Sequence, residues 1–424
     1  MAAAANRPNI GIMDWNSLDA FKYQPEHTAL KALLAGVPLD GATRRAIHGE
    51  AMMLVRTARA RAHRGGVIEN FLQEFSLDTQ EGLALMCLAE ALLRTPDQAT
   101  QDLLIAEAVG GGDWKGHLGR SDSLFVNAST WGLMLTGRLV EIGGEAAGDL
   151  PGFLRRTVAR AGAPVIRAAI VQAVRIMSEQ FVLGRTIDEA LRRAEREGFL
   201  CSFDMLGEGA RTADDAARYE AAYARALGAI ADIGAGRDGP ENGHGISVKL
   251  SALSPRYEPL QEERVWGELY PRLLRLARRA ADANINMTLD AEEADRLVLS
   301  LTLLERLAGE SVLGSWRGLG LAVQAYQTRA VHVIDRRAER ALGSGRRLMV
   351  RLVKGAYWDS EIKRAQIAGR PDYPVFTTKP ATDLSYLACA RTLIAAAPAL
   401  YPQFASHNAH TLAAMRLMAR EAGV

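Results

Sequence analysis

The chain has 424 residues, with 51 Lys and Arg against 49 Asp and Glu, so its formal net charge at pH 7 is +2. This length exceeds one typical domain and can hold a barrel of about 250 residues together with accessory helices. The balanced charge excludes a general electrostatic attraction to nucleic acid or to acidic membranes.

The cysteine pattern and the apolar runs indicate a cytoplasmic protein. Three scattered cysteines, Cys87, Cys201 and Cys389, form neither a disulfide framework nor a zinc site. The apolar run 83–93 contains Glu90 and is too short to span a bilayer. The N-terminus lacks the charged and apolar regions of a signal peptide.

The first half of the chain predicts an arm followed by helices. Residues 1–45 carry little sustained periodicity, so we expect an arm that needs a partner surface. Residues 46–195 show apolar positions at steps of three and four, with helix starts at 76–81 and 95–97. We interpret 46–195 as an accessory helical domain without catalytic groups.

After residue 196 short apolar runs alternate with amphipathic stretches, which is typical of a βα repeat. Seven candidate strands begin near Phe199, Ile246, Ile285, Leu319, Leu348, Val375 and Phe404. The predicted fold is an α/β (βα)8 TIM-type barrel over 196–424. Because such a barrel needs eight strands, we expect it to be truncated before its last strand.

The stretch 347–359 runs from an apolar strand into a dense group of polar side chains. Arg351 interrupts the apolar run and is expected to face an anion or polar ligand. Lys354, Gly355, Ala356, Tyr357 and Trp358 then supply a cation, two small residues and two aromatic faces. This set suits a phosphorylated, flat, aromatic cofactor. The alternative is a structural strand end whose Arg and Lys face solvent.

Polar residues also follow the other predicted strands, where barrel enzymes place their active sites. They are Asp204, Glu208, Lys249, Asp290, Glu292, Glu293, Gln324, Gln327, Thr377, Thr378, Lys379, Ser406, His407 and Asn408. Taken singly, Lys249 reads as a solvated lysine and Asp290 as a helix cap. Cations, amides and hydroxyls predominate, without a nucleophile and base pair. His407 and His410 lack a third ligand nearby, so no metal site is predicted. No GxGxxG fingerprint follows a strand.

Long segments resemble the proline dehydrogenase part of the proline utilisation A family. They are SVKLSALSPRY (247–257), LDAEEADRL (289–297), QAYQ (324–327), RLVKGAYWDSEIKRAQ (351–366), YPVFTTK (373–379) and YPQFASHNAHT (401–411). Upstream, SLDTQEGLALMCLAEALLRTPD (76–97), GDWKGHLG (112–119) and SLFVNASTWGL (123–133) resemble the helical domain of the same family. The resemblance covers nearly the whole chain.

This resemblance implies an FAD-dependent oxidation of L-proline to Δ1-pyrroline-5-carboxylate, with a hydride moving to flavin N5. Lys249 would pair with the proline carboxylate, Asp290 would order the site, and Tyr357 would pack over the substrate. Arg351 and Gln324 would hydrogen-bond the flavin ring, with Arg351 stabilising its reduced form. Glu208 is a candidate gate residue. Other cofactor contacts would come from Lys354, Gly355, Ala356, Tyr357, Trp358, Thr377, Lys379, Thr382, Ser406, His407 and Asn408.

The resemblance also implies partners and leaves an alternative open. Electrons would pass to a quinone at the membrane surface, so a peripheral position at the inner membrane face is expected, together with homo-oligomerisation. The family's paired arginine that clamps the proline carboxylate and its aldehyde dehydrogenase domain would lie beyond Val424. Residues 1–27 do not resemble the DNA-binding segment of some relatives, and no nucleic-acid partner is expected. The alternative is an inactive truncated fragment that acts only in association.

Overall fold

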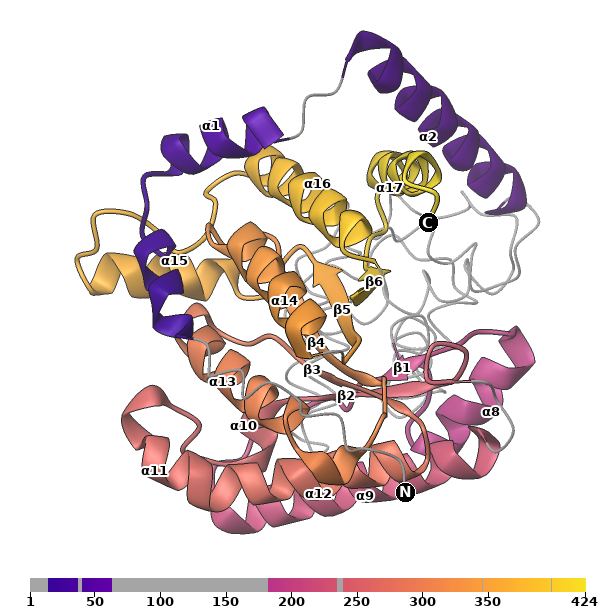
Figure 1. Cartoon of the computed structure of the whole chain (residues 1–424). Coiled ribbons are helices and arrows are strands. Elements are labelled where there is room, and N and C mark those ends of the chain that lie inside the picture. The colour runs from indigo at the N-terminus through magenta and orange to yellow at the C-terminus, as the bar shows by residue number, and fades with distance from the viewer. Residues whose placement is uncertain (1–13, 37–39, 63–181, 235–238, 345, 398) are drawn as a thin grey trace, which may run out of the picture. The chain divides into compact units, whose positions relative to one another are not determined.

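A computed structural model describes residues 14–36, 40–62, 182–234, 239–344, 346–397 and 399–424 (Figure 1). The chain divides into two compact units, one formed by 1–55 with 194–424 and the other by 56–193. The first unit contains the sheet and the residues that surround it. The helix starts predicted at 76–81 and 95–97 lie outside the described residues, as do the upstream segments of the family resemblance.

The sheet has six parallel strands that lie side by side in the order of the sequence. They are β1 (Ser202–Phe203), β2 (Gly245–Val248), β3 (Asn286–Leu289), β4 (Leu319–Gln324), β5 (Leu348–Val353) and β6 (Leu400–Phe404). Helical segments separate successive strands, as in a TIM-type (βα)8 barrel. The predicted fold class is therefore confirmed, with six strands in the part of the chain that the structure describes.

The helical segments are numbered in chain order with the strands (Figure 1). They are α8 (Ile187–Glu197), α9 (Ala213–Gly234), α10 (Leu250–Leu253), η3 (Pro259–Gln261), α11 (Glu262–Arg264), η4 (Val265–Leu269), α12 (Tyr270–Asp282), η5 (Ala294–Arg296), α13 (Leu297–Ala308), η6 (Ser311–Leu313), α14 (Ala330–Ser344), α15 (Trp358–Ile367), α16 (Lys379–Ala395) and α17 (Ala409–Glu421). Helix α17 directly follows β6.

Burial explains why these residues form a parallel sheet with outer helices. All residues of β2, β3 and β4 are buried, as strands covered on both faces require. In α12 the buried positions Leu273, Leu276 and Ala280 recur at helical spacing, whereas Arg275 and Arg279 are exposed. Each helix therefore buries one stripe of its surface.

The strand predicted near Val375 is wrong. Val375 forms only an isolated antiparallel bridge with Gln327, and the neighbouring Phe376 N–H donates to the Tyr326 carbonyl at 2.8 Å. Only eleven residues separate the end of α15 from the start of α16, and Pro374 lacks an N–H for a ladder. The apolar segment is buried against the loop after β4. The last strand also begins at Leu400, four residues before the predicted Phe404.

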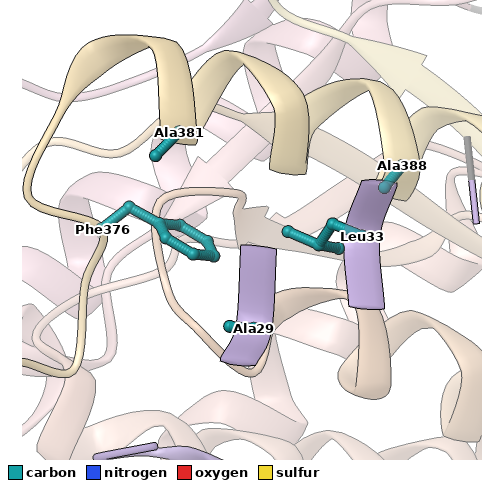
Figure 2. Close-up of a cluster of buried hydrophobic side chains, with 5 residues drawn as sticks. All are labelled: Ala29, Leu33, Phe376, Ala381 and Ala388. Carbon is teal, nitrogen blue, oxygen red and sulfur yellow. The ribbon is translucent and has the colours of Figure 1, made fainter. Parts of the chain in front are cut away.

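The N-terminal arm finds its partner surface on the barrel helices of the same chain. It contains η1 (Trp15–Phe21), α1 (Glu26–Gly36) and the start of α2 (Gly41–Ala62). Ala29 and Leu33 of α1 pack with Phe376 and with α16 in a buried cluster (Figure 2). Ile47 of α2 belongs to a second cluster, with α17. These contacts give a weakly periodic segment its structure.

Replacing Leu33 with alanine is expected to lower the free energy of unfolding by about 2–3 kcal/mol, because it empties a well-packed site. The neighbouring Leu34 provides a matched control, since Leu33 is 7% exposed and Leu34 is 60% exposed. Leu34→Ala should change stability by less than about 0.5 kcal/mol. Urea unfolding of both variants measures the difference. Equal losses would show that α1 does not dock through Leu33.

Candidate active site

Five polar residues lie at the C-terminal ends of five adjacent strands. Asp204, Lys249, Asp290 and Lys354 directly follow β1, β2, β3 and β5, and Gln324 is the last residue of β4. Because the strands are parallel, these ends meet at one edge of the sheet. This edge is the site rim. The sequence predicted this placement from strand boundaries alone.

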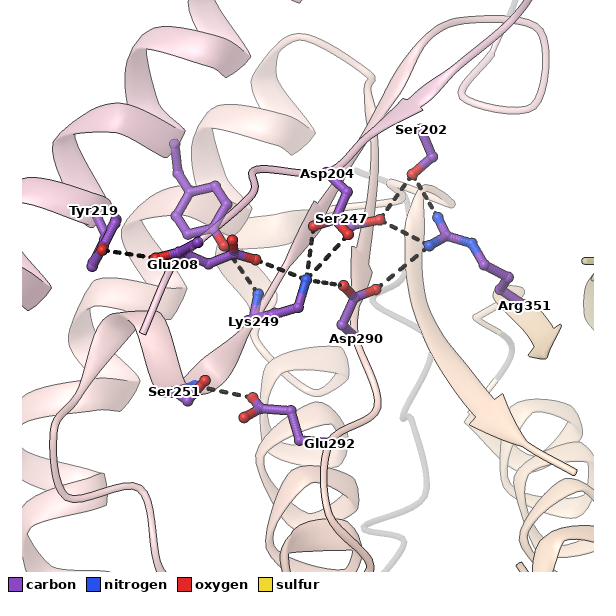
Figure 3. A network of polar contacts seen from close by, with 12 residues as sticks. Ser202, Asp204, Glu208, Tyr219, Ser247, Lys249, Ser251, Asp290, Glu292 and Arg351 are labelled. Atoms are coloured by element: carbon purple, nitrogen blue, oxygen red, sulfur yellow. Dashed lines mark hydrogen bonds and ion pairs between the residues drawn. The ribbon is translucent and has the colours of Figure 1, made fainter. Parts of the chain in front are cut away.

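Lys249 lies among three carboxylates at the rim (Figure 3). Its Nζ is 2.9 Å from Asp204 Oδ1, 2.7 Å from Glu208 Oε1 and 3.0 Å from Asp290 Oδ2. The Lys249 side chain is 22% exposed and the Glu208 side chain 2%. An ammonium has three hydrogens to donate. Asp204 and Asp290 accept hydrogen bonds from this ammonium, and Glu208 contacts it as an ion pair.

Three carboxylates around one lysine repel one another, even with Arg351 nearby, and this repulsion disfavours their ionised forms. Burial raises the pKa of Glu208 and of Asp290, and the ion pairs with Lys249 only partly oppose this. For Lys249 burial acts to lower the pKa, but Asp290, Glu208 and Asp204 outweigh it and raise the pKa. The lysine stays charged, and Glu208 and Asp290 hold their protons more readily than usual.

The raised pKa of Glu208 predicts a pH-dependent stability. The folded chain holds this proton more tightly than the unfolded chain does, so the associated stability is present below the ordinary pKa of 4.5 and is lost as the pH rises through the folded pKa. Glu208→Gln removes this loss. The melting temperature of Glu208→Gln minus that of the unsubstituted protein should be larger at pH 8 than at pH 5. An opposite or absent pH dependence would contradict the assignment.

Arg351 reaches from β5 to the side chains of β1 and β2 (Figure 3). Its guanidinium donates to Ser247 Oγ at 2.8 Å and to Ser202 Oγ at 2.5 Å. It also lies 3.5 Å from Asp290 Oδ1, so Asp290 joins Arg351 to Lys249. Burial lowers the pKa of Arg351, although the group remains a cation at neutral pH. Arg351 thus faces polar partners within the chain, and the expectation that it faces an anion or polar ligand stays a prediction.

The segment after β5 is held by β4 and its loop. Gly355 has φ +144°, and a Cβ there would lie 2.5 Å from the Tyr326 ring. The Tyr326 hydroxyl accepts from the Tyr357 N–H at 3.3 Å. Gln324 accepts from the Ala356 N–H at 3.0 Å and donates to the Glu292 carbonyl at 2.8 Å. Burial raises the pKa of Tyr357 to about 12, so its phenol stays protonated.

Lys354 and Lys379 share Asp383 at the start of α16. Lys354 pairs with Asp383 Oδ1, and Lys379 Nζ lies 2.9 Å from its Oδ2. The Thr378 side chain caps α16 by accepting from the Ala381 N–H. Thr382 is buried one turn into the helix. The helix N-terminus and two cations thus converge near the rim.

The residues after β6 form a local cap. The Asn408 side chain accepts from the Thr411 N–H and starts α17, and the Asn408 N–H donates to Ser406 Oγ at 3.1 Å. His407 and His410 are exposed. Trp358 donates to the Phe376 carbonyl at 2.9 Å. These predicted cofactor contacts lie apart from the hydrogen-bonded network of Lys249, Asp290 and Arg351.

Comparison with known families now decides which barrel this is. The sequence profile described as "Proline dehydrogenase" matches residues 187–424, more than half of the chain. The chain belongs to the proline dehydrogenase family. This agrees with the resemblance that the sequence segments indicated.

Curated relatives in this family extend the likeness over most of the chain. It is 52% identical over 398 residues to "Bifunctional protein PutA" of Salmonella typhimurium, covering 92% of this chain and 30% of that protein. It is 49% identical over 400 residues to the protein of the same name from Rhizobium meliloti, covering 93% of this chain and 32% of that one. The chain therefore spans about a third of the length of these relatives.

Solved structures of the same family agree. A crystal structure of a variant of Bradyrhizobium japonicum proline utilization A matches 98% of this chain and 41% of its own, with 45% identity and a TM-score of 0.68. Another structure of proline utilization A, described as having "proline bound in remote sites", matches with 46% identity and a TM-score of 0.68, over 98% of this chain and 41% of its own.

A second profile of the proline dehydrogenase family corrects one expectation. The profile described as "DNA-binding domain of Proline dehydrogenase" matches residues 67–181, which lie outside the described residues. This description does not fit the expectation that the chain has no nucleic-acid partner, and that expectation is withdrawn.

Neither a metal-binding cluster nor a membrane-spanning helix occurs among the described residues of this family member. They contain no group of three or more His, Cys, Asp or Glu arranged to hold a metal ion. None of the helices in the described ranges is long and apolar enough to cross a membrane.

Sequence reasoning missed several residues that hold the rim together in this proline dehydrogenase fold. They are Ser202, Ser247, Tyr326, Asp383 and, from the arm, Glu26. Only Asp383 carried a local signal, because it lies one helical turn after Lys379. The others depend on contacts between segments far apart in the sequence.

Proposed function

We propose that the rim is the active site of an FAD-dependent proline dehydrogenase, which oxidises L-proline to Δ1-pyrroline-5-carboxylate and passes the electrons to a quinone. The convergence of Lys249 and Arg351 on Asp290 within the family-matched barrel carries this proposal. The division into an arm (1–45), a helical domain (46–195) and a barrel (196–424), homo-oligomerisation, and a peripheral position at the inner membrane face belong to the same proposal.

The residues beside β5 fit a flavin dinucleotide. Gly355 and Ala356 are exposed and small, so a flat ring can approach their backbone closely. Lys354 and Lys379 offer cations beside the N-terminus of α16, which is a suitable place for phosphate oxygens. Arg351 and Gln324 would face the ring, with Thr377, Thr382 and residues 406–408 nearer the rest of the cofactor. When bound, FAD supplies the acceptor for the hydride of proline.

The carboxylate cluster suits a substrate that is both an amine and an acid. Lys249 would hold the proline carboxylate by an ion pair, replacing one of its present carboxylate partners. Asp290 would keep Lys249 and Arg351 in place, because it contacts both. Because the pKa of Glu208 is raised, this side chain takes up a proton more readily, and protonation would weaken its ion pair with Lys249. The protonated phenol of Tyr357 would pack over the substrate.

Spectroscopy of the purified chain tests the proposal. A yellow preparation, or one that becomes yellow after incubation with FAD, is expected to lose its flavin absorbance when L-proline is added without oxygen. D-proline at the same concentration is the matched control, and a soluble quinone should restore the absorbance. A chain that binds no FAD, or bound FAD that L-proline does not bleach, would contradict the proposal and favour a role in association only.

A further inference from the structure

The N-terminal arm contacts three loops that border the site rim. In the loop after β3, Asp295 pairs with Lys22 of the arm. In the loop after β4, Arg329 Nη1 lies 2.8 Å from Asp19 Oδ1 of the arm. Thr328 Oγ also donates to the Phe21 carbonyl at 2.7 Å. Residues more than 270 positions apart in the sequence are joined by these contacts. The arm therefore ties neighbouring rim loops to each other.

The third contact concerns the segment that leads into α16. The Glu26 carboxylate accepts from the Thr377 N–H at 3.2 Å and from the Thr377 hydroxyl at 2.7 Å. A hydrogen bond to a charged acceptor is stronger than one between neutral groups. Because the hydroxyl gives its hydrogen to Glu26, the Thr377 oxygen is left to accept hydrogen bonds from a ligand.

An apolar contact supports the same segment from the neighbouring residue. Phe376 is fully buried between Ala29 and Leu33 of α1 and Ala381 of α16 (Figure 2). Its backbone continues into the site, because the Phe376 carbonyl accepts from Trp358 Nε1 and the Phe376 N–H donates to Tyr326. The arm thus reaches Trp358 and Tyr326 through a single packed residue.

We propose that Glu26 is a positioning residue, which holds Thr377 in the conformation that flavin binding requires. This inference rests on the proposed function, since Thr377 belongs to the cofactor contacts proposed there. The arm acts as a brace across the rim, and its ion pairs at Asp19 and Lys22 set the register in which Glu26 meets Thr377. A weakly periodic N-terminal segment thereby acquires a role in cofactor affinity.

The test compares Glu26→Ala and Glu26→Gln with Glu50→Ala in the whole chain freed of flavin. Glu50 is a matched control, because it is another carboxylate of the N-terminal region and pairs with Arg416 and Arg420 of α17 instead. Three quantities are measured: hydrogen exchange of the Thr377 amide, the melting temperature, and the dissociation constant for added FAD.

Glu26→Ala is expected to speed exchange at the Thr377 amide and to weaken FAD binding by about tenfold, since one strong hydrogen-bonded contact is lost. Glu26→Gln keeps one acceptor oxygen and should recover most of the affinity. Glu50→Ala should leave exchange at Thr377 and FAD affinity unchanged.

The outcomes separate the inference from the proposed function. Unchanged exchange at Thr377 in Glu26→Ala overturns the brace, and so does faster exchange with unchanged FAD affinity. A weaker affinity that Glu50→Ala reproduces also overturns it, because the effect would then be general. If the unsubstituted protein binds no FAD, the proposed function itself fails.

Discussion

Replacing Lys249 with methionine is expected to reduce kcat/KM for L-proline by about 100-fold or more, with flavin content unchanged. Loss of a desolvated ion pair to a substrate carboxylate typically costs about 3 kcal/mol or more. The change also leaves Asp204, Glu208 and Asp290 without their shared cation, so that the substrate carboxylate meets a cluster of acids. Both effects raise KM most strongly. Steady-state kinetics with flavin absorbance on the same preparation measures them.

Lys363→Met is the matched control for this change, because Lys363 is exposed on α15. It removes the same charge from the protein as a whole and should leave kcat/KM within about twofold, as is usual for surface substitutions. A Lys249→Met protein that loses FAD but keeps its affinity for proline would show that Lys249 serves the cofactor instead.

Replacing Gly355 with alanine should lower the free energy of unfolding by about 3 kcal/mol or more and prevent retention of FAD. The backbone there has φ +144°, a conformation that side chains rarely adopt. A Cβ would lie 2.5–2.6 Å from three ring atoms of Tyr326, which is itself buried and cannot move freely. The segment that carries Ala356 and Tyr357 must then shift. Denaturant unfolding and flavin content measure the two effects.

Gly369→Ala is a control for a methyl group added at a positive φ without a clash. Gly369 also has a positive φ, +59°, but nothing lies within 4 Å of its added Cβ. This control should cost only about 1 kcal/mol and leave flavin binding intact. Similar losses in both variants would mean that contact between Gly355 and Tyr326 does not shape the site.

The sequence by itself determined the repeat and the residues at the strand ends. Buried parallel strands require continuous apolar runs, and a polar residue that follows such a run must lie at the sheet edge. Lys249, Asp290 and Lys354 were therefore predictable as rim residues, and their long neighbouring segments indicated the family. Both signals are local, since each depends on residues within one βα unit.

Only the tertiary structure decided which rim residues meet and what supports them. An apolar run at 373–376 reads as a strand, yet it packs against the arm and the β4 loop because a neighbouring surface buries it there. The three carboxylates around Lys249 come from the segments that follow β1 and β3, and Glu26 comes from the arm. Such contacts join residues distant in the sequence, so no periodicity or spacing encodes them. Packing of the whole barrel brings them together.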